Sequence, residues 1–245
     1  KRTDIIYNKS FNYERMFVVL EIILWIMRFF FGAGIFSFLH IVIDKLTYGK
    51  SAICAKSKRI ARYFLVELTG GVSMTGCAIV YGCGKMGVIS LRGAFFFIYL
   101  GILFVIALVD WHIQMIYDRF HIMILILAVL DFMLYPEMGI ATRLTGMGII
   151  SVPMLVLALA IPGAFGGGDI KLMSVSGLLI GGASMICAMC IGIITGGAYV
   201  TLMLVRKRLN KTDQFAFGPF LAFGLATAIF LGDKMAVWYL QFGAV

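Results

Sequence analysis

Charged residues are scarce in this chain of 245 residues. Asp, Glu, Lys and Arg together make up 13% of the sequence, whereas a soluble domain usually carries about 25%. Hydrophobic residues make up 62%, and the mean hydropathy is +1.00. A chain this poor in charge, with repeated long apolar runs, is typical of an integral membrane protein and not of a soluble one.

Paired cysteines are also lacking. Two of the cysteines form a CxxC, but it falls inside an apolar run and no second pair accompanies it. An odd number of cysteines, most of them within apolar runs, is typical of small core residues. We therefore predict neither a disulfide framework nor a zinc site from the five cysteines, which are Cys54, Cys77, Cys83, Cys187 and Cys190.

A secretory signal and internal repeats are absent as well. No small-residue cleavage site follows the first apolar run, so residues 1–16 are not expected to be a cleaved signal. The sequence shows no repeat and no low-complexity tract. We treat it as one membrane domain with two working parts: residues 1–90, which hold two spans and a short basic loop, and residues 91–245, which hold six spans.

Long apolar runs recur along the whole chain. About 20 apolar residues are needed to cross a bilayer as a helix, and eight runs are candidates. The predicted fold is therefore an all-α, polytopic helical bundle of about eight transmembrane spans. The predicted spans are 17–43, 61–81, 93–109, 121–135, 141–161, 170–180, 183–205 and an eighth that starts near 215 and reaches 231 or beyond.

Basic residues are concentrated in the loops between these runs. The loop at 44–62 and the loop after 205 are both rich in Lys and Arg, and with eight spans they lie on the same side. The positive-inside rule assigns that side to the cytoplasm, although four basic residues also precede the first span. The net charge of +9 is thus explained by topology, and nucleic acid is not a predicted partner.

Two aspartates stand out among the ionisable residues. Asp110 ends the third span in ALVDWHIQMIYDRF, and Asp169 closes FGGGDIKLM just before the sixth. The predicted topology puts both at the cytoplasmic ends of their helices, where they could meet. Two carboxyl groups that share a proton can hydrolyse a peptide bond by acid–base catalysis. The alternative is that neither aspartate is catalytic, with Asp169 as a helix N-cap and Asp110 as an interface residue.

Five ordered motifs resemble those of the type IV prepilin peptidases. GGGDIKLM resembles the family's GxGD signature through Gly166, Gly168, Asp169 and Lys171. VDWHIQMIYD resembles the other signature, in which Asp or Asn follows the first aspartate by eight residues, as Asp118 follows Asp110. Tyr117 stands where that signature usually has proline. The segments GIFSFLHIVI, RYFLVELTGG and FGPFLAFG resemble further family motifs at 34–43, 62–71 and 217–224.

The resemblance implies a membrane-embedded aspartic endopeptidase with Asp110 and Asp169 as catalytic residues. Its substrates would be type IV prepilin or pseudopilin precursors, cut after a glycine between a short basic leader and a hydrophobic helix. The enzyme would be a multi-pass protein of the inner or plasma membrane, in contact with lipid, with its active site facing the cytoplasm. The sequence specifies no oligomeric state.

The first cytoplasmic loop departs from the family pattern. Bifunctional members carry two CxxC pairs there with zinc-type spacing, whereas this loop holds only Cys54, and a tetrahedral zinc site needs four ligands. We therefore predict no metal and no cofactor for proteolysis. S-adenosylmethionine would be a cofactor only if the methyltransferase activity of the bifunctional members were retained.

Several other residues are candidates for supporting roles. Gly166, Gly167 and Gly168 give the backbone before Asp169 conformational freedom and no side-chain bulk, so a substrate strand could lie against them. Lys171 could hold charge near the aspartates or reach to the membrane interface. Asp118 and Glu67 are candidate supporting groups, and Glu67 is also a candidate for a methyl-transfer site. For His112 and His121 an interface role is predicted, and for Asp131 a place near the outer interface.

Helix ends predict which aspartate holds the shared proton. Asp110 lies at the negative C-terminal end of its helix and Asp169 at the positive N-terminal end of its own. This predicts an ionised Asp169 and a protonated Asp110. Two rival functions remain at this stage: a proton-coupled transporter that uses intramembrane carboxylates, and an inactive relative that serves as a pilus-assembly scaffold.

Overall fold

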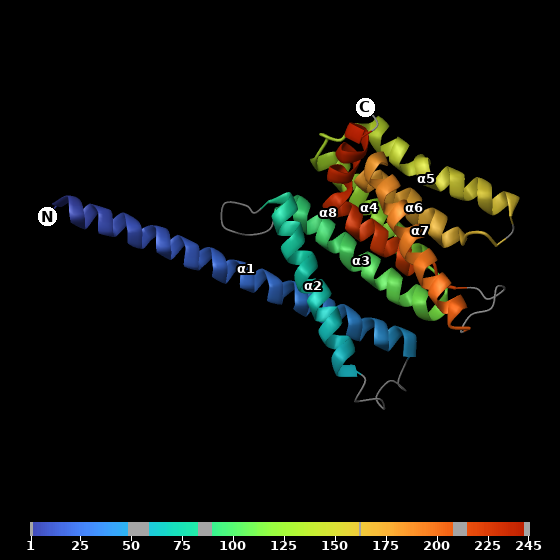
Figure 1. The fold of residues 1–245 in the computed structure, drawn as a ribbon, viewed down its shortest axis with the longest axis horizontal. Coiled ribbons are helices and arrows are strands. Elements are labelled where there is room, and N and C mark those ends of the chain that lie inside the picture. The colour runs from blue at the N-terminus through green and yellow to red at the C-terminus, as the bar shows by residue number, and fades with distance from the viewer. Residues whose placement is uncertain (1, 49–58, 83–89, 162, 208–214, 243–245) are drawn as a thin grey trace. The chain divides into compact units, whose positions relative to one another are not determined.

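The computed structural model describes residues 2–48, 59–82, 90–161, 163–207 and 215–242, and every secondary-structure element in these ranges is a helix. Eight helices are described, one over each predicted apolar run (Figure 1), so the all-helical prediction is confirmed. They are α1 (Arg2–Tyr48), α2 (Arg59–Tyr81), α3 (Leu91–Ile113), α4 (Asp118–Leu134), α5 (Ile140–Ala160), α6 (Gly167–Ile180), α7 (Gly182–Val205) and α8 (Gly218–Phe242).

Four of the described helical stretches are long and apolar enough to cross a membrane. They are Val18–Ile41, Leu91–Ile113, Ile140–Ala160 and Gly182–Val205. The predicted count of eight spans is not confirmed. Helix α6, with 14 residues, is only about 21 Å long, whereas the hydrocarbon core is about 30 Å thick. Helix α4 has 17 residues, and α2 and α8 contribute shorter apolar stretches.

The chain divides into two compact units, Lys1–Phe97 and Ile98–Val245. In the first unit α1 and α2 pack together, and they cross at a pair of glycines. A Cβ atom added to Gly32 or to Gly70 would lie 2.5 Å from the carbonyl oxygen of the other, so only glycine allows this approach. The segment between these helices, which includes Cys54, lies outside the described residues. The division into an N-terminal part (1–90) and a peptidase core (91–245) stays a prediction.

Helix α6 is the central element of the second unit. It packs against α4, α5, α7 and α8, and half of its residues are buried, among them Leu172, Met173 and Leu179. Its closest neighbour is α5, because a Cβ on Gly177 would collide with the carbonyl oxygen of Gly146. A helix enclosed in this way does not need the length of a lipid-facing span, which accounts for its 14 residues.

The C-terminal end of α6 is fixed by a buried ion pair. The Arg143 guanidinium donates to Asp131 Oδ2 at 2.7 Å, to the carbonyl of Leu178 at 3.1 Å and to that of Met138 at 3.3 Å. Both charged side chains are almost fully buried. The Arg143 side chain thus joins α4, α5 and α6 at the end of α6 that is opposite Asp169.

Candidate active site

Asp110 lies in the last turn of α3, and 5% of it is exposed. Helix α3 ends at Ile113, and Gln114 then adopts a left-handed conformation with φ of 54°, a common helix terminator. The Asp110 carboxylate is held from another element, because the backbone N–H of Gly218 donates to its Oδ2 at 3.0 Å. Gly218 is the first residue of α8, so Asp110 lies at the N-terminus of that helix.

Asp169 is the third residue of α6, and 9% of it is exposed. The N-cap of this helix is Gly166, whose backbone N–H donates to the Asp169 carboxylate. This is the carboxylate half of a capping box, in which the residue at N3 reaches back to the N-cap. The alternative in which Asp169 is a helix N-cap is therefore wrong, because Gly166 occupies that position.

The two carboxyl groups interact across the space between α3 and α6. Burial, and then the negative charge of Asp110, raise the pKa of Asp169 to about 7, against a smaller opposing effect of the Gly166 N–H. The contribution of Asp110 means that the two groups are near enough for their charges to interact. Close carboxyl groups hold a proton between them near neutral pH, as acid–base hydrolysis requires.

The structure favours a protonated Asp169 and an ionised Asp110. This is the opposite of what the ends of α3 and α6 predict. Asp110 accepts a hydrogen bond from the first N–H of α8, and the positive end of that helix stabilises its negative charge. Asp169, with its raised pKa, then holds the proton. The helix-end prediction was incomplete, because it considered only the helices that carry the two aspartates and not α8, which begins next to Asp110.

The three glycines before Asp169 differ in what surrounds them. None of them is among the described glycines with positive φ, so their conformations are open to other residues. A Cβ on Gly166 would lie 3.1 Å from Asp169 Oδ2, and one on Gly168 would lie 3.0 Å from the Cβ of Ile116. A Cβ on Gly167 would have no heavy atom within 4 Å. Gly166 and Gly168 thus serve the site by their small size, and the predicted conformational freedom is not used.

Two of the predicted supporting residues pair with each other. Lys171 Nζ donates to Asp118 Oδ1 at 2.8 Å, and both side chains are largely exposed. This contact lowers the pKa of Asp118. The pair joins the first turn of α6 to the first turn of α4. Glu67 lies in the first unit, where its carboxylate accepts a hydrogen bond from Ser37 at 3.2 Å; its role stays a prediction.

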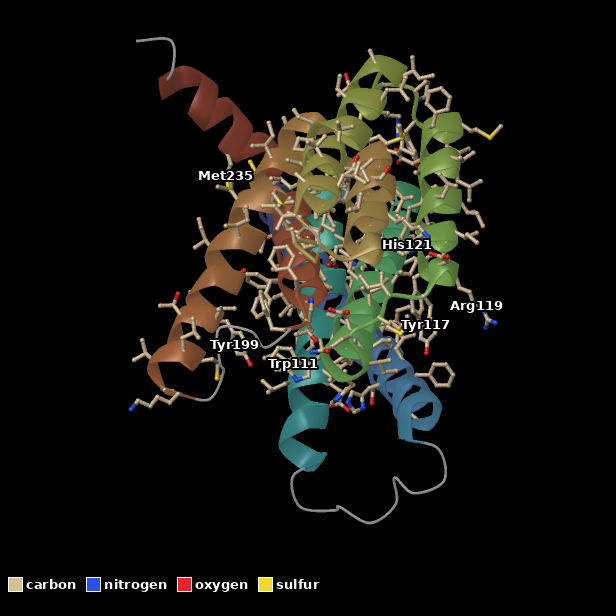
Figure 2. All side chains as sticks on the ribbon, turned by 90° about the vertical axis from the view of Figure 1, so that its right-hand side faces the viewer. Trp111, Tyr117, Arg119, His121, Tyr199 and Met235 are labelled. Carbon is tan, nitrogen blue, oxygen red and sulfur yellow. The ribbon has the colours of Figure 1, made fainter. Side chains whose placement is uncertain are left out.

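The sequence analysis missed an aromatic cluster around the two aspartates. Trp111 follows Asp110 in the chain and lies against Tyr199, with ring centroids 5.6 Å apart (Figure 2). Phe217 precedes Gly218 and lies 6.0 Å from Phe165, which precedes Gly166. Each backbone segment that holds a carboxylate therefore carries one of these rings. The available signal was an aromatic residue beside each motif, but nothing in the sequence showed that the rings meet. The cluster is Trp111, Phe165, Tyr199, Phe215, Phe217 and Phe220.

Metal-binding side chains do not gather in the part of the chain that the structure describes. No group of three or more His, Cys, Asp or Glu residues there could hold a metal ion. The residues around the two aspartates are instead backbone N–H groups, glycines and aromatic rings. What they offer a reaction is acid–base chemistry and an apolar contact surface.

Comparison with known proteins shows a similarity to one peptidase family. Residues 97–201, which include both aspartates, match the type IV leader peptidase family. A prepilin leader peptidase/N-methyltransferase of Bacillus subtilis (strain 168) is 26% identical over 144 residues. These residues are 59% of this chain and 58% of that relative, so the match spans little more than half of the relative's length. No solved structure matches the chain. The part of the chain that holds both aspartates is thus similar to the type IV leader peptidase family, and the apolar helices are those of a membrane protein.

Proposed function

We propose that this chain is an aspartic-type endopeptidase that removes leader peptides from type IV prepilin-like or pseudopilin precursors. Asp110 and Asp169 are its catalytic residues. The observation that carries the proposal is the buried pair of carboxyl groups, in which burial and then the charge of Asp110 raise the pKa of Asp169 to about 7. One group is then charged and the other protonated near neutral pH, and peptide hydrolysis needs both forms.

The charged and protonated groups have separate roles in the reaction. The Asp110 carboxylate takes a proton from a water molecule, whose oxygen forms a bond to the carbonyl carbon of the scissile peptide. Asp169 gives its proton to the carbonyl oxygen as the tetrahedral intermediate forms. When the intermediate collapses, the C–N bond breaks. The leaving amine then takes the proton that Asp110 received, and Asp169 regains its own proton from the intermediate.

The surroundings of the pair suit a substrate that is apolar on one side of the cleaved bond. The aromatic cluster offers rings on the three backbone segments that hold the carboxylates, and 48% of Trp111 is exposed. We propose that the hydrophobic helix of the precursor lies in the lipid against this surface. Its short basic leader, with a glycine at the cleavage site, remains on the other side of the bond.

We propose that the active site faces the cytoplasm at the inner or plasma membrane. Exposed Arg206 and Lys207 end α7, and Tyr199 of the same helix lies against Trp111, next to Asp110. Basic residues at the end of a membrane span that is shared with the site support this orientation.

The proteolytic step that we propose uses no metal and no cofactor. The name of the Bacillus subtilis relative also includes N-methyltransferase activity, for which S-adenosylmethionine would be the cofactor. Glu67 was a candidate for such a site; its carboxylate accepts a hydrogen bond from Ser37, and we assign no methyl-transfer step to this chain. A proton-coupled transporter is not favoured, because residues 97–201, which hold both aspartates, are similar to a peptidase family.

Cleavage of a full-length type IV prepilin by the purified chain tests the proposal. Asp110→Asn and Asp169→Asn should each lower the rate by about 100- to 10,000-fold, the contribution of a general acid or base, without loss of folded protein. Glu137→Gln, an exposed carboxylate in the turn between α4 and α5, is the matched control and should keep the wild-type rate. Substantial cleavage by either aspartate variant would refute the assignment.

A further inference from the structure

His121 lies on the buried face of α4 and reaches the backbone next to Asp169. Its Nε2 lies 3.0 Å from the carbonyl oxygen of Gly168, and 5% of the residue is exposed. In Figure 2 His121 is labelled within the bundle, whereas Arg119 of the same helix points away from it. The sequence analysis predicted an interface role for this histidine, which does not account for its burial.

The contact with Gly168 is one link of a closed loop of interactions. Lys171 Nζ donates to Asp118 Oδ1 at 2.8 Å, and Asp118 Oδ1 lies 3.5 Å from His121 Nδ1. His121 Nε2 then contacts Gly168. We call these four residues, Gly168 and Lys171 on α6 with Asp118 and His121 on α4, the clasp. Its two attachments to α6 lie on either side of Asp169 in the sequence.

The clasp acts on Asp169 through the peptide bond. The carbonyl of Gly168 and the N–H and Cα of Asp169 belong to one planar unit. Fixing that oxygen therefore fixes the position from which the Asp169 side chain starts. A carbonyl oxygen has two lone pairs, so it can accept from His121 as well as from a helical N–H.

We propose that His121 is a positioning residue for Asp169, and this rests on the catalytic role proposed for that aspartate. The hydrogen bond that His121 Nε2–H donates to the Gly168 carbonyl holds the first turn of α6 so that the Asp169 carboxyl group faces Asp110.

Within the clasp, the buried His121–Gly168 hydrogen bond contributes most to the positioning of Asp169. The Lys171–Asp118 pair has side chains that are 59% and 68% exposed, and solvent-exposed ion pairs contribute little. The His121–Gly168 hydrogen bond is shielded from water. If the imidazole is removed, water therefore cannot easily replace it as the donor to the Gly168 carbonyl. Removing the imidazole donor should therefore matter more than neutralising Lys171 or Asp118.

Two substitutions at one position separate positioning from simple stability. His121→Gln retains an N–H donor that can reach Gly168, whereas His121→Ala removes it. With a full-length type IV prepilin as substrate, His121→Ala should lower kcat by about 10- to 100-fold, as expected for a reacting group displaced by up to 1 Å. KM should stay nearly unchanged, and His121→Gln should recover most of the lost kcat.

Ile124→Ala is the matched stability control. Ile124 lies one turn further along α4 and is fully buried, so its truncation should lower Tm without changing kcat. If His121→Ala keeps the wild-type kcat, or if His121→Gln is as impaired as His121→Ala, the proposal is wrong. It is also wrong if Ile124→Ala loses kcat to the same extent as His121→Ala.

Hydrogen exchange measures the clasp without reference to activity. Backbone amides in a peptide that covers 166–172 should exchange faster in His121→Ala than in the wild type, and at the wild-type rate in His121→Gln. Unchanged exchange in His121→Ala would overturn the clasp itself. If the wild-type chain does not cleave prepilin, the proposed function fails, and the exchange measurement still decides whether His121 holds this turn.

Discussion

Replacing Gly218 with alanine should impair catalysis by Asp110 although the aspartate itself is not substituted. Gly218 begins α8, and its N–H donates to Asp110 Oδ2 at 3.0 Å. An alanine Cβ at this position would lie 2.6 Å from the same oxygen and 3.0 Å from Asp110 Cγ. The carboxylate must therefore move, or α8 must move away from it.

The size of the effect follows from these distances. Non-bonded heavy atoms prefer separations of about 3.5 Å or more, so the carboxylate oxygen must retreat by roughly 1 Å. A displacement of about 1 Å in an active site can lower the rate by a factor of about 100. The hydrogen bond from Gly218 to a charged group is worth about 1.5–3 kcal/mol. Its loss alone corresponds to a factor of about 10–100, so both arguments predict a large fall in kcat.

Initial rates of prepilin cleavage by the purified variants provide the assay. Gly197→Ala is the matched control, because Gly197 is an exposed glycine in α7 and its added Cβ would have no heavy atom within 4 Å. Both variants should elute as folded protein and differ only in kcat. If Gly218→Ala retains a kcat close to that of Gly197→Ala, the Gly218 contact does not hold Asp110 in its catalytic position.

Three further predictions concern protonation, stability and the glycine motif. Because Asp169 must be protonated and its pKa is raised to about 7, kcat/KM should fall as pH rises through 7, by about tenfold per pH unit; a pH–rate profile still rising at pH 9 would contradict this. Arg143→Met leaves the buried Asp131 without its cation and should cost about 3–5 kcal/mol of stability, seen as a lower Tm. Asp131→Asn should cost less, because Arg143 keeps its three carbonyl acceptors. Gly166→Ala should lower kcat more than Gly167→Ala, because only the former puts a Cβ against Asp169; equal losses would count against it.

The helices could be predicted from the sequence because their signal is local. Each apolar run became a helix, and the described helix ends lie within a few residues of the predicted ones except in α1; α8 continues beyond 231, as the prediction allowed. The number of spans could not be predicted in the same way. Whether a short apolar helix such as α6 crosses the lipid depends on its neighbours, and the contact of Gly146 with Gly177 that encloses it joins residues 31 positions apart.

The two aspartates could also be predicted, because their motifs are contiguous. The groups that control them come from elsewhere in the chain. Gly218 is separated from Asp110 by 108 positions, and His121 from Gly168 by 47. No local pattern shows such contacts. For the same reason the dipole argument, which lacked the N-terminus of α8, led to the opposite protonation from the one that the structure favours.

The glycine signature before Asp169 can be explained by the small size of glycine. Gly166 and Asp169 are three positions apart at the start of a helix and therefore lie on one face, where a Cβ would meet the carboxylate at 3.1 Å. Gly168 faces the segment before α4, where a Cβ would press on Ile116 at 3.0 Å. Gly167 turns away from both and meets nothing within 4 Å. A motif written GxGD is what these contacts require, because two of the three positions exclude a side chain and the middle one does not. A substitution at 166 should therefore be read first as a displacement of the Asp169 carboxyl group, and one at 168 as a displacement of the segment that holds Ile116.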